Sequence, residues 1–151
     1  MALRTATRST TGPLFVDSNV LVYAHDLEAG AKRSAAAALL ERLWDAQNGV
    51  LSVQVLQEFY VNVTRKIAQP VALAQAREVL RLYRFWIRNE TDADTVLRAS
   101  EIAELSQISF WDGLIVASAE EAGCTELATE DLAHGETIAG VRIVNPFVAE
   151  R

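Results

Sequence analysis

The sequence has 151 residues, half of them hydrophobic and 23% charged, with a formal net charge of −6 and a single cysteine, Cys124. This length suits one domain with a sizeable core, which we expect over residues 14–148 behind a flexible N-terminal tail, residues 1–13. The acidic balance argues against a protein that binds nucleic acid by charge alone. One cysteine cannot form an internal disulfide, no apolar run could span a bilayer, and the N-terminus lacks the apolar stretch of a secretory signal. We therefore expect a cytoplasmic protein without membrane association.

The first predicted strand is followed directly by an acid. Residues 14–16 form a short apolar run that is typical of a buried strand, Asp17 comes next, and an apolar helix pattern starts at Val20. In open α/β sheets, ligands bind at the carboxyl ends of the strands, so Asp17 is a candidate ligand-binding residue. Aspartate is also a good helix N-cap, and Asp17 taken alone supports the two interpretations about equally.

Helical periodicity and strand-like runs alternate along the rest of the chain. Further helices are predicted over residues 31–47, 54–67, 70–86, 91–106 and 109–123, and further strands over residues 50–53, 87–90, 125–129 and 141–144. Strands that alternate with helices predict an α/β fold with a parallel sheet and helices on both of its faces. No internal repeat or linker divides the chain.

Three more carboxylates stand at strand ends or in the helices beside them: Glu58, Asp112 and Asp131. If these acids converge with Asp17, two unit charges 4 Å apart repel by about 4 kcal/mol at an effective dielectric near 20. Such a cluster must take up protons or bind a cation. Oxygen ligands favour Mg²⁺ or Mn²⁺, and such an ion can activate water for attack on a phosphodiester.

Each of these acids also has a purely structural interpretation. Glu58 could be a solvated residue of an amphipathic helix, although its neighbours place it on or near the apolar stripe. Asp112 could cap a helix and interact with its dipole. Asp131 could be a turn residue, and Glu130 beside it is a rival for the ligand role.

Four segments carry the acids: DSNVLVYAHD, LSVQVLQEFYVNVTRK, SFWDGLIVASAEEAGC and LATEDLAHG. In this order they resemble the PIN domain and, within it, the VapC-type ribonuclease toxins. The resemblance runs from about Leu14 to Pro146. It assigns the four acids of the family, in order, to Asp17, Glu58, Asp112 and Asp131, with support from Ser18, Asn19 and Thr129.

The resemblance implies a three-layer α/β/α sandwich with a central parallel sheet of four to five strands. It also implies a metal-dependent endoribonuclease, using Mg²⁺ or Mn²⁺, that cleaves single-stranded RNA and leaves a 5′-phosphate and a 3′-hydroxyl. The implied partners are a second copy of the chain in a homodimer and an antitoxin protein that holds the enzyme inactive.

Two other functions remain to be compared with this one. A catalytically silent PIN-fold module for RNA binding or dimerisation is the main alternative, and the complete set of acids argues against it. A phospho-accepting receiver domain would use a lysine near the end of the last strand, and the chain has none near Val144.

Arg65 and Lys66 close the helix predicted over residues 54–67. Cations at this end complement the helix dipole. The same pair could contact RNA phosphate instead. The sequence favours neither interpretation.

Overall fold

The computed structural model describes residues 12–148. The N-terminal tail expected over residues 1–13 lies, apart from its last two residues, outside this described part. None of the helices between residues 12 and 148 combines the length and the apolar character that crossing a membrane would require.

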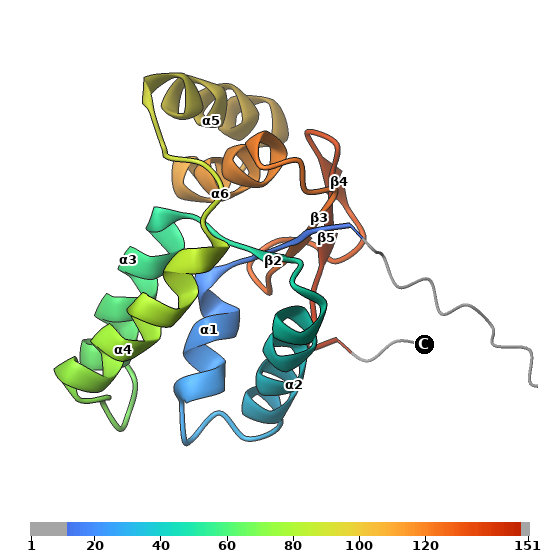
Figure 1. Ribbon diagram of the computed structural model, residues 1–151. Coiled ribbons are helices and arrows are strands. Elements are labelled where there is room, and N and C mark those ends of the chain that lie inside the picture. Colours follow the sequence, from blue (N-terminus) through green and yellow to red (C-terminus); the bar gives the residue numbers. More distant parts are fainter. Residues whose placement is uncertain (1–11, 149–151) are drawn as a thin grey trace, which may run out of the picture.

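A five-stranded sheet forms the middle layer (Figure 1). In the order β2-β1-β3-β5-β4, its strands are β2 Gly49–Val50, β1 Leu14–Val16, β3 Glu126–Ala128, β5 Val141–Val144 and β4 Thr137–Ile138. The first four run parallel, and β4 pairs antiparallel with β5. The mostly parallel sheet confirms the α/β fold predicted from the sequence. The two-residue β4 was not predicted, because a strand of this length has too few residues to produce a recognisable pattern.

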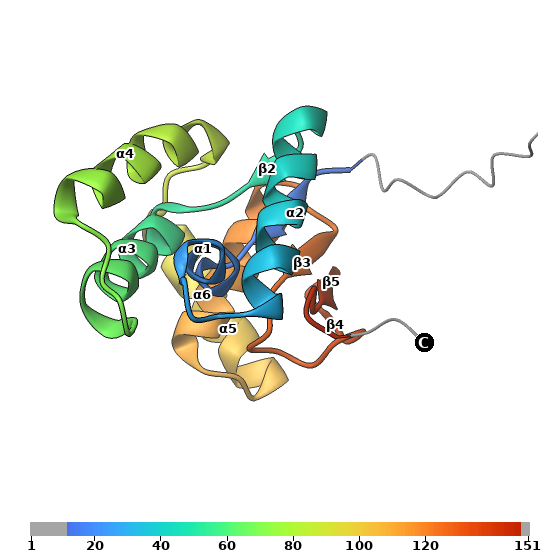
Figure 2. The ribbon, with the colours of Figure 1, turned by 90° about the horizontal axis from the view of Figure 1, so that it is seen from below.

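Helices cover both faces of the sheet and complete the three layers. One face carries α1 Ser18–His25 and α2 Ala31–Ala46, and the other carries α5 Ala93–Ser106 and α6 Phe110–Glu121. Seen from below, α1 and α2 lie nearest the viewer and α6 lies behind α1 (Figure 2). Beside α1 pack α3 Val53–Val61 and, against it, α4 Leu73–Tyr83.

The core explains why the central strands are rich in apolar residues. Phe15, Val16, Leu127 and Ile143, on the central strands β1, β3 and β5, are all buried to 1% exposure or less. A parallel sheet with helices on both faces buries alternate side chains on either side, so a strand covered on both faces, such as β1, is apolar throughout, whereas β5 has an exposed Arg142 near its amino end. Polar residues such as Asp17 and Thr129 therefore follow directly after β1 and β3, where the chain leaves the sheet.

Four predicted elements differ from the structure. The strand predicted over residues 50–53 is β2, which ends at Val50, and Val53 already begins α3. The helix predicted over residues 54–67 divides into α3 and a π-helical turn, Asn62–Lys66. β-Branched side chains are restricted in a regular α-helix, and the hydrogen bond that Thr64 Oγ1 donates to the Tyr60 carbonyl competes with the backbone, so both favour the change. The helix predicted over residues 70–86 is α4 followed by a 3₁₀ turn, Arg84–Trp86. The strand predicted over residues 87–90 is a single parallel bridge between Leu51 and Ile87.

Candidate active site

The pairing of β1 with β3 decides where the candidate site lies. Val16 pairs with Ala128, so the next residues, Asp17 and Thr129, leave the sheet side by side at the carboxyl ends of their strands. The Asp17 N–H donates to the Ala128 carbonyl over 3.0 Å, and Thr129 Oγ1 donates to Asp17 Oδ2 over 2.8 Å. Residues 112 positions apart in the chain thereby share one polar cluster.

Asp17 also caps α1. Its Oδ1 accepts a hydrogen bond from the backbone N–H of Ser18 over 2.7 Å, and the residue is only 4% exposed. The N-cap interpretation of Asp17 is therefore correct as geometry. It does not compete with a site role, because the second carboxylate oxygen meets Thr129 instead of the helix.

Thr129 is the centre of the hydrogen-bond network. It is fully buried, and its hydroxyl donates to Asp17. The same oxygen accepts from Asn19 Nδ2 and from the Asp131 backbone N–H, each over 3.1 Å. Asn19 Nδ2 also donates to Asp131 Oδ2 over 3.1 Å. One threonine and one asparagine thus fix the first and the last of the four predicted acids relative to each other.

Glu58 joins the cluster from α3. Ser18 Oγ donates to Glu58 Oε2 over 3.1 Å, which links the first turn of α1 to the middle of α3. Within residues 12–148, the other oxygen, Oε1, is buried and has no hydrogen-bond partner. Burial raises the pKa of Glu58, a hydrogen bond from Ser18 opposes this rise, and the charges of Asp131 and Asp112 add to it.

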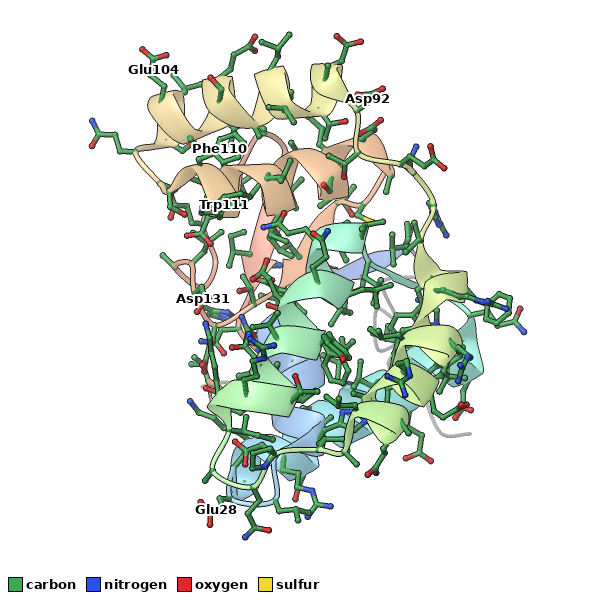
Figure 3. All side chains as sticks on the ribbon, turned by 90° about the vertical axis from the view of Figure 1, so that its left-hand side faces the viewer. Glu28, Asp92, Glu104, Phe110, Trp111 and Asp131 are labelled. Carbon is green, nitrogen blue, oxygen red and sulfur yellow. The ribbon has the colours of Figure 1, made fainter. Side chains whose placement is uncertain are left out.

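Asp112 approaches from the other side of the sheet. It lies in the first turn of α6, where its backbone N–H donates to the side chain of the N-cap residue Ser109 over 3.0 Å. Its carboxylate is partly buried, and burial followed by the charge of Asp131 raises its pKa. Figure 3 shows Asp131 and Trp111, the neighbour of Asp112, along the same edge of the molecule.

Glu130, the rival of Asp131, is engaged elsewhere. Tyr23 donates a hydrogen bond to Glu130 Oε1, and Lys32 Nζ forms an ion pair with Oε2 at 2.9 Å. Partial burial acts to raise the pKa of Glu130, but these two partners outweigh it and hold the pKa below its usual value. No local sequence pattern indicates Tyr23 or Lys32 as a partner of Glu130, because only the packing of α1 and α2 brings them to this loop.

The charges and donor atoms of the cluster fit a hard cation. Burial, despite hydrogen bonds from Thr129 and Ser18, raises the pKa of Asp17 from 3.8 to about 7, and the charges of Glu58 and Asp131 add to the effect. No three acid, histidine or cysteine side chains in the described part of the chain are already arranged to hold an ion. Mg²⁺ needs only one or two direct carboxylates and keeps several waters, so the absence of a ready group of three ligands among the described residues does not conflict with a metal role.

The raised pKa of Asp17 predicts how the stability of the metal-free protein depends on pH. Between the unfolded value of 3.8 and the folded value of about 7, the folded protein binds the proton more tightly than the unfolded chain. The free energy of unfolding should therefore fall as pH rises through this window, by about 4 kcal/mol for Asp17 alone. The melting temperature of the wild type minus that of Asp17→Asn, measured in EDTA from below to above this window, checks the sign; a difference that rises with pH would contradict it.

A family model and several solved structures match this chain. The model of the PIN domain matches residues 14–137. The fold resembles that of a FitAB complex bound to an IR36 DNA fragment, with a TM-score of 0.68, 19% identity, and coverage of 91% of this chain and 98% of that one. It also resembles VapC20 of Mycobacterium tuberculosis, a sarcin-ricin loop cleaving toxin, with a TM-score of 0.54, 21% identity, and coverage of 76% and 86%. A third similar structure is VapBC2 of Rickettsia felis bound to a promoter DNA fragment, with a TM-score of 0.56, 20% identity, and coverage of 86% and 96%. No curated protein matches the sequence.

Proposed function

This chain belongs to the PIN domain family, and from that premise we propose that it is a metal-dependent endoribonuclease that cleaves single-stranded RNA. The observation that carries the proposal is the gathering of carboxylates from the start of α1, from α3, from α6 and from the loop after β3. Thr129, Ser18 and Asn19 join three of them by hydrogen bonds. The fourth, Asp112, is coupled to the group through the charge of Asp131.

In this proposal, Asp17, Glu58, Asp112 and Asp131 hold Mg²⁺ or Mn²⁺. The ion would activate a water molecule and stabilise the charge that develops on the phosphate oxygens. Hydrolysis joins the water oxygen to phosphorus in line with the P–O3′ bond as that bond breaks, and a proton ends on the departing 3′ oxygen. The products are a 5′-phosphate and a 3′-hydroxyl.

The uncharged polar residues of the cluster, Thr129, Ser18 and Asn19, position the carboxylates. The hydroxyl of Thr129 holds Asp17, that of Ser18 holds Glu58, and the amide of Asn19 holds Asp131. Substitution of side chains that orient metal ligands commonly lowers metal affinity or activity about 10- to 100-fold. Each of these three residues therefore acts on the reaction through the carboxylate that it positions.

We also propose that the protein is a toxin that forms a homodimer and is held inactive by an antitoxin protein. The solved structures of similar fold include VapBC2 of Rickettsia felis and a toxin–antitoxin complex from Klebsiella pneumoniae. Large apolar side chains on α4, on the turn after it and on α5 are exposed, and a protein partner that covers them would remove this apolar surface from water: Leu73, Leu82, Phe85, Leu97 and Leu105. Light scattering of the purified protein should give twice the chain mass of 16.6 kDa.

Titration with Mn²⁺ tests the enzymatic proposal. The purified protein, stripped of metal with EDTA, should cleave a mixed single-stranded RNA only after Mn²⁺ is added, and the ion should raise its melting temperature by binding the folded state. Binding and cleavage should saturate together. Neither binding nor cleavage would support the silent RNA-binding or dimerisation module instead, whereas metal binding without cleavage would point to a narrow substrate requirement that the mixed RNA does not meet.

A further inference from the structure

A cavity of about 450 Å³ opens beside the acids. Glu58 and Asp131 line it together with Tyr23, Asn62 and Lys66. Its volume lies within the range of pockets that hold small molecules in proteins. A strand that lies across the acids therefore has room for one of its units here.

The π-helical turn after α3 explains why Lys66 reaches this cavity. An α-helix turns by about 100° per residue, so a residue eight positions after Glu58 would point about 80° away from it. The N–H of Ile67 instead donates to the Asn62 carbonyl over 3.1 Å, five residues back. A π-helical turn rotates less per residue than an α-helix and so offsets the angle of about 80° that an α-helix would place between Glu58 and Lys66. Asn62 and Lys66 therefore lie on the same side of the helix as Glu58. Turns of this kind occur frequently at functional sites.

The charges around the cavity indicate where a phosphate would bind. Three carboxylate residues that repel an anion line the cavity, Asp26, Glu58 and Asp131, and Lys66 is the one cation among its described lining residues. Arg65, its neighbour in the chain, does not line it. The structure thus separates two residues that the sequence left equivalent.

The remaining polar groups suit a nucleotide better than a bare anion. Asn62 brings a carboxamide with both donors and an acceptor, which can pair with a base edge or a ribose hydroxyl. Bases of single-stranded RNA are free to leave the stack and enter such a pocket, whereas those of a duplex are not. Val22 and Ile67 add apolar surface against which a base or ribose can pack.

We propose that this cavity is a subsite for one nucleotide of the RNA strand next to the scissile phosphate, with its own phosphate on Lys66 and its base or ribose on Asn62. The inference rests on the proposed ribonuclease activity and adds to it the place of the flanking nucleotide. It assigns binding roles to Lys66 and Asn62, and none to Arg65.

The variant Lys66→Ala tests the phosphate contact. With Mn²⁺ and a mixed single-stranded RNA, KM should rise roughly tenfold and kcat should change little, because a phosphate contact away from the reacting bond contributes equally to the ground and transition states. Binding of a fluorescein-labelled single-stranded RNA, measured by anisotropy in the Asp17→Asn background, should weaken to a similar degree. The slope of log Kd against log salt should fall by about 0.7, the value for one phosphate contact in a single strand.

Three further variants separate this contact from general charge effects. Lys66→Arg keeps the charge and should retain tight binding. Arg142→Ala removes one positive charge at the start of β5, the end of the sheet opposite to the acids, and should leave binding unchanged. Asn62→Asp keeps the shape of the side chain but adds a negative charge, and it should weaken RNA binding while the circular dichroism spectrum and melting temperature remain those of a folded protein.

The outcomes distinguish this inference from the proposed function. Unchanged KM, Kd and salt slope in Lys66→Ala, with a wild-type protein that cleaves RNA, would overturn the subsite and leave the ribonuclease intact. An equal loss of RNA affinity in Arg65→Ala would likewise overturn it, because a residue outside the cavity would then contribute as much to binding as Lys66 does. A wild-type protein that never cleaves RNA, but binds it less tightly after Lys66→Ala, would support nucleotide binding in this cavity while overturning the enzymatic proposal and, with it, the placement beside a scissile phosphate.

Discussion

Asp17→Asn is expected to lower RNA cleavage by about 10³-fold or more while the protein remains folded. The carboxylate of Asp17 is the most buried of the four and receives hydrogen bonds on both of its oxygens, from Ser18 and from Thr129. An amide has the same shape but no charge and only one acceptor oxygen, so it cannot replace the carboxylate as a metal ligand. Initial rates with saturating Mn²⁺ and single-stranded RNA measure the loss.

The same substitution should stabilise the metal-free protein above neutral pH. Burial raises the pKa of Asp17 to about 7, so at higher pH the wild-type protein keeps a buried negative charge that the asparagine lacks. We expect a gain of about 1–3 kcal/mol, less than the charge effect alone because one hydrogen bond is also weakened. The gain should vanish below the unfolded pKa of 3.8, where both forms are neutral.

Asp92 provides a matched control for Asp17. It is also an aspartate N-cap, at the start of α5, but it is exposed, and hydrogen bonds with Thr95 lower its pKa instead of raising it. Asp92→Asn should therefore leave cleavage unchanged and give no gain in stability at high pH. A folded Asp17→Asn protein that cleaves RNA at the wild-type rate would refute the assignment of the site.

Thr129→Val is expected to reduce both cleavage and stability. The two side chains have nearly the same volume, but valine has no hydroxyl, so Asp17 loses a donor while Asn19 and the Asp131 backbone N–H lose an acceptor. Because Thr129 is fully buried, we expect a loss of about 2–4 kcal/mol in the free energy of unfolding. Cleavage should fall roughly 10- to 100-fold, since Thr129 positions two of the acids without being one of them.

Thr129→Ser separates the hydrogen bonds from the packing. Serine keeps the hydroxyl and loses one buried methyl group, so stability should fall by only about 1 kcal/mol and cleavage should stay within a few-fold of the wild type. Urea denaturation and initial cleavage rates are measured on both variants. If serine and valine lower cleavage equally, the hydroxyl has no positioning role and Thr129 is only a packing residue.

The sequence determined the elements that local signals specify. An apolar run from residue 14 to 16 that ends at Asp17, and the helices predicted over residues 91–106 and 109–123, are patterns that neighbouring residues encode, and the structure has all three. The alternation of strands and helices likewise predicted a parallel sheet covered on both faces, and four of the five strands in the described part are parallel. The order of the four acids along the chain is visible in the sequence, and their assignment as metal ligands stays a prediction.

Only the tertiary structure decided how these residues meet. The register between β1 and β3 places Thr129 against Asp17, and the packing of α1 against α3 brings Ser18 to Glu58. The tertiary structure also pairs Glu130 with Lys32 of α2. A π-helical turn, which the helical periodicity of the sequence did not indicate, brings Lys66, but not Arg65, to the cavity. Each of these contacts joins elements through strand pairing, helix packing or the hydrogen bonds of one turn, and such pairings depend on the energy of the whole fold rather than on the residues next to each position.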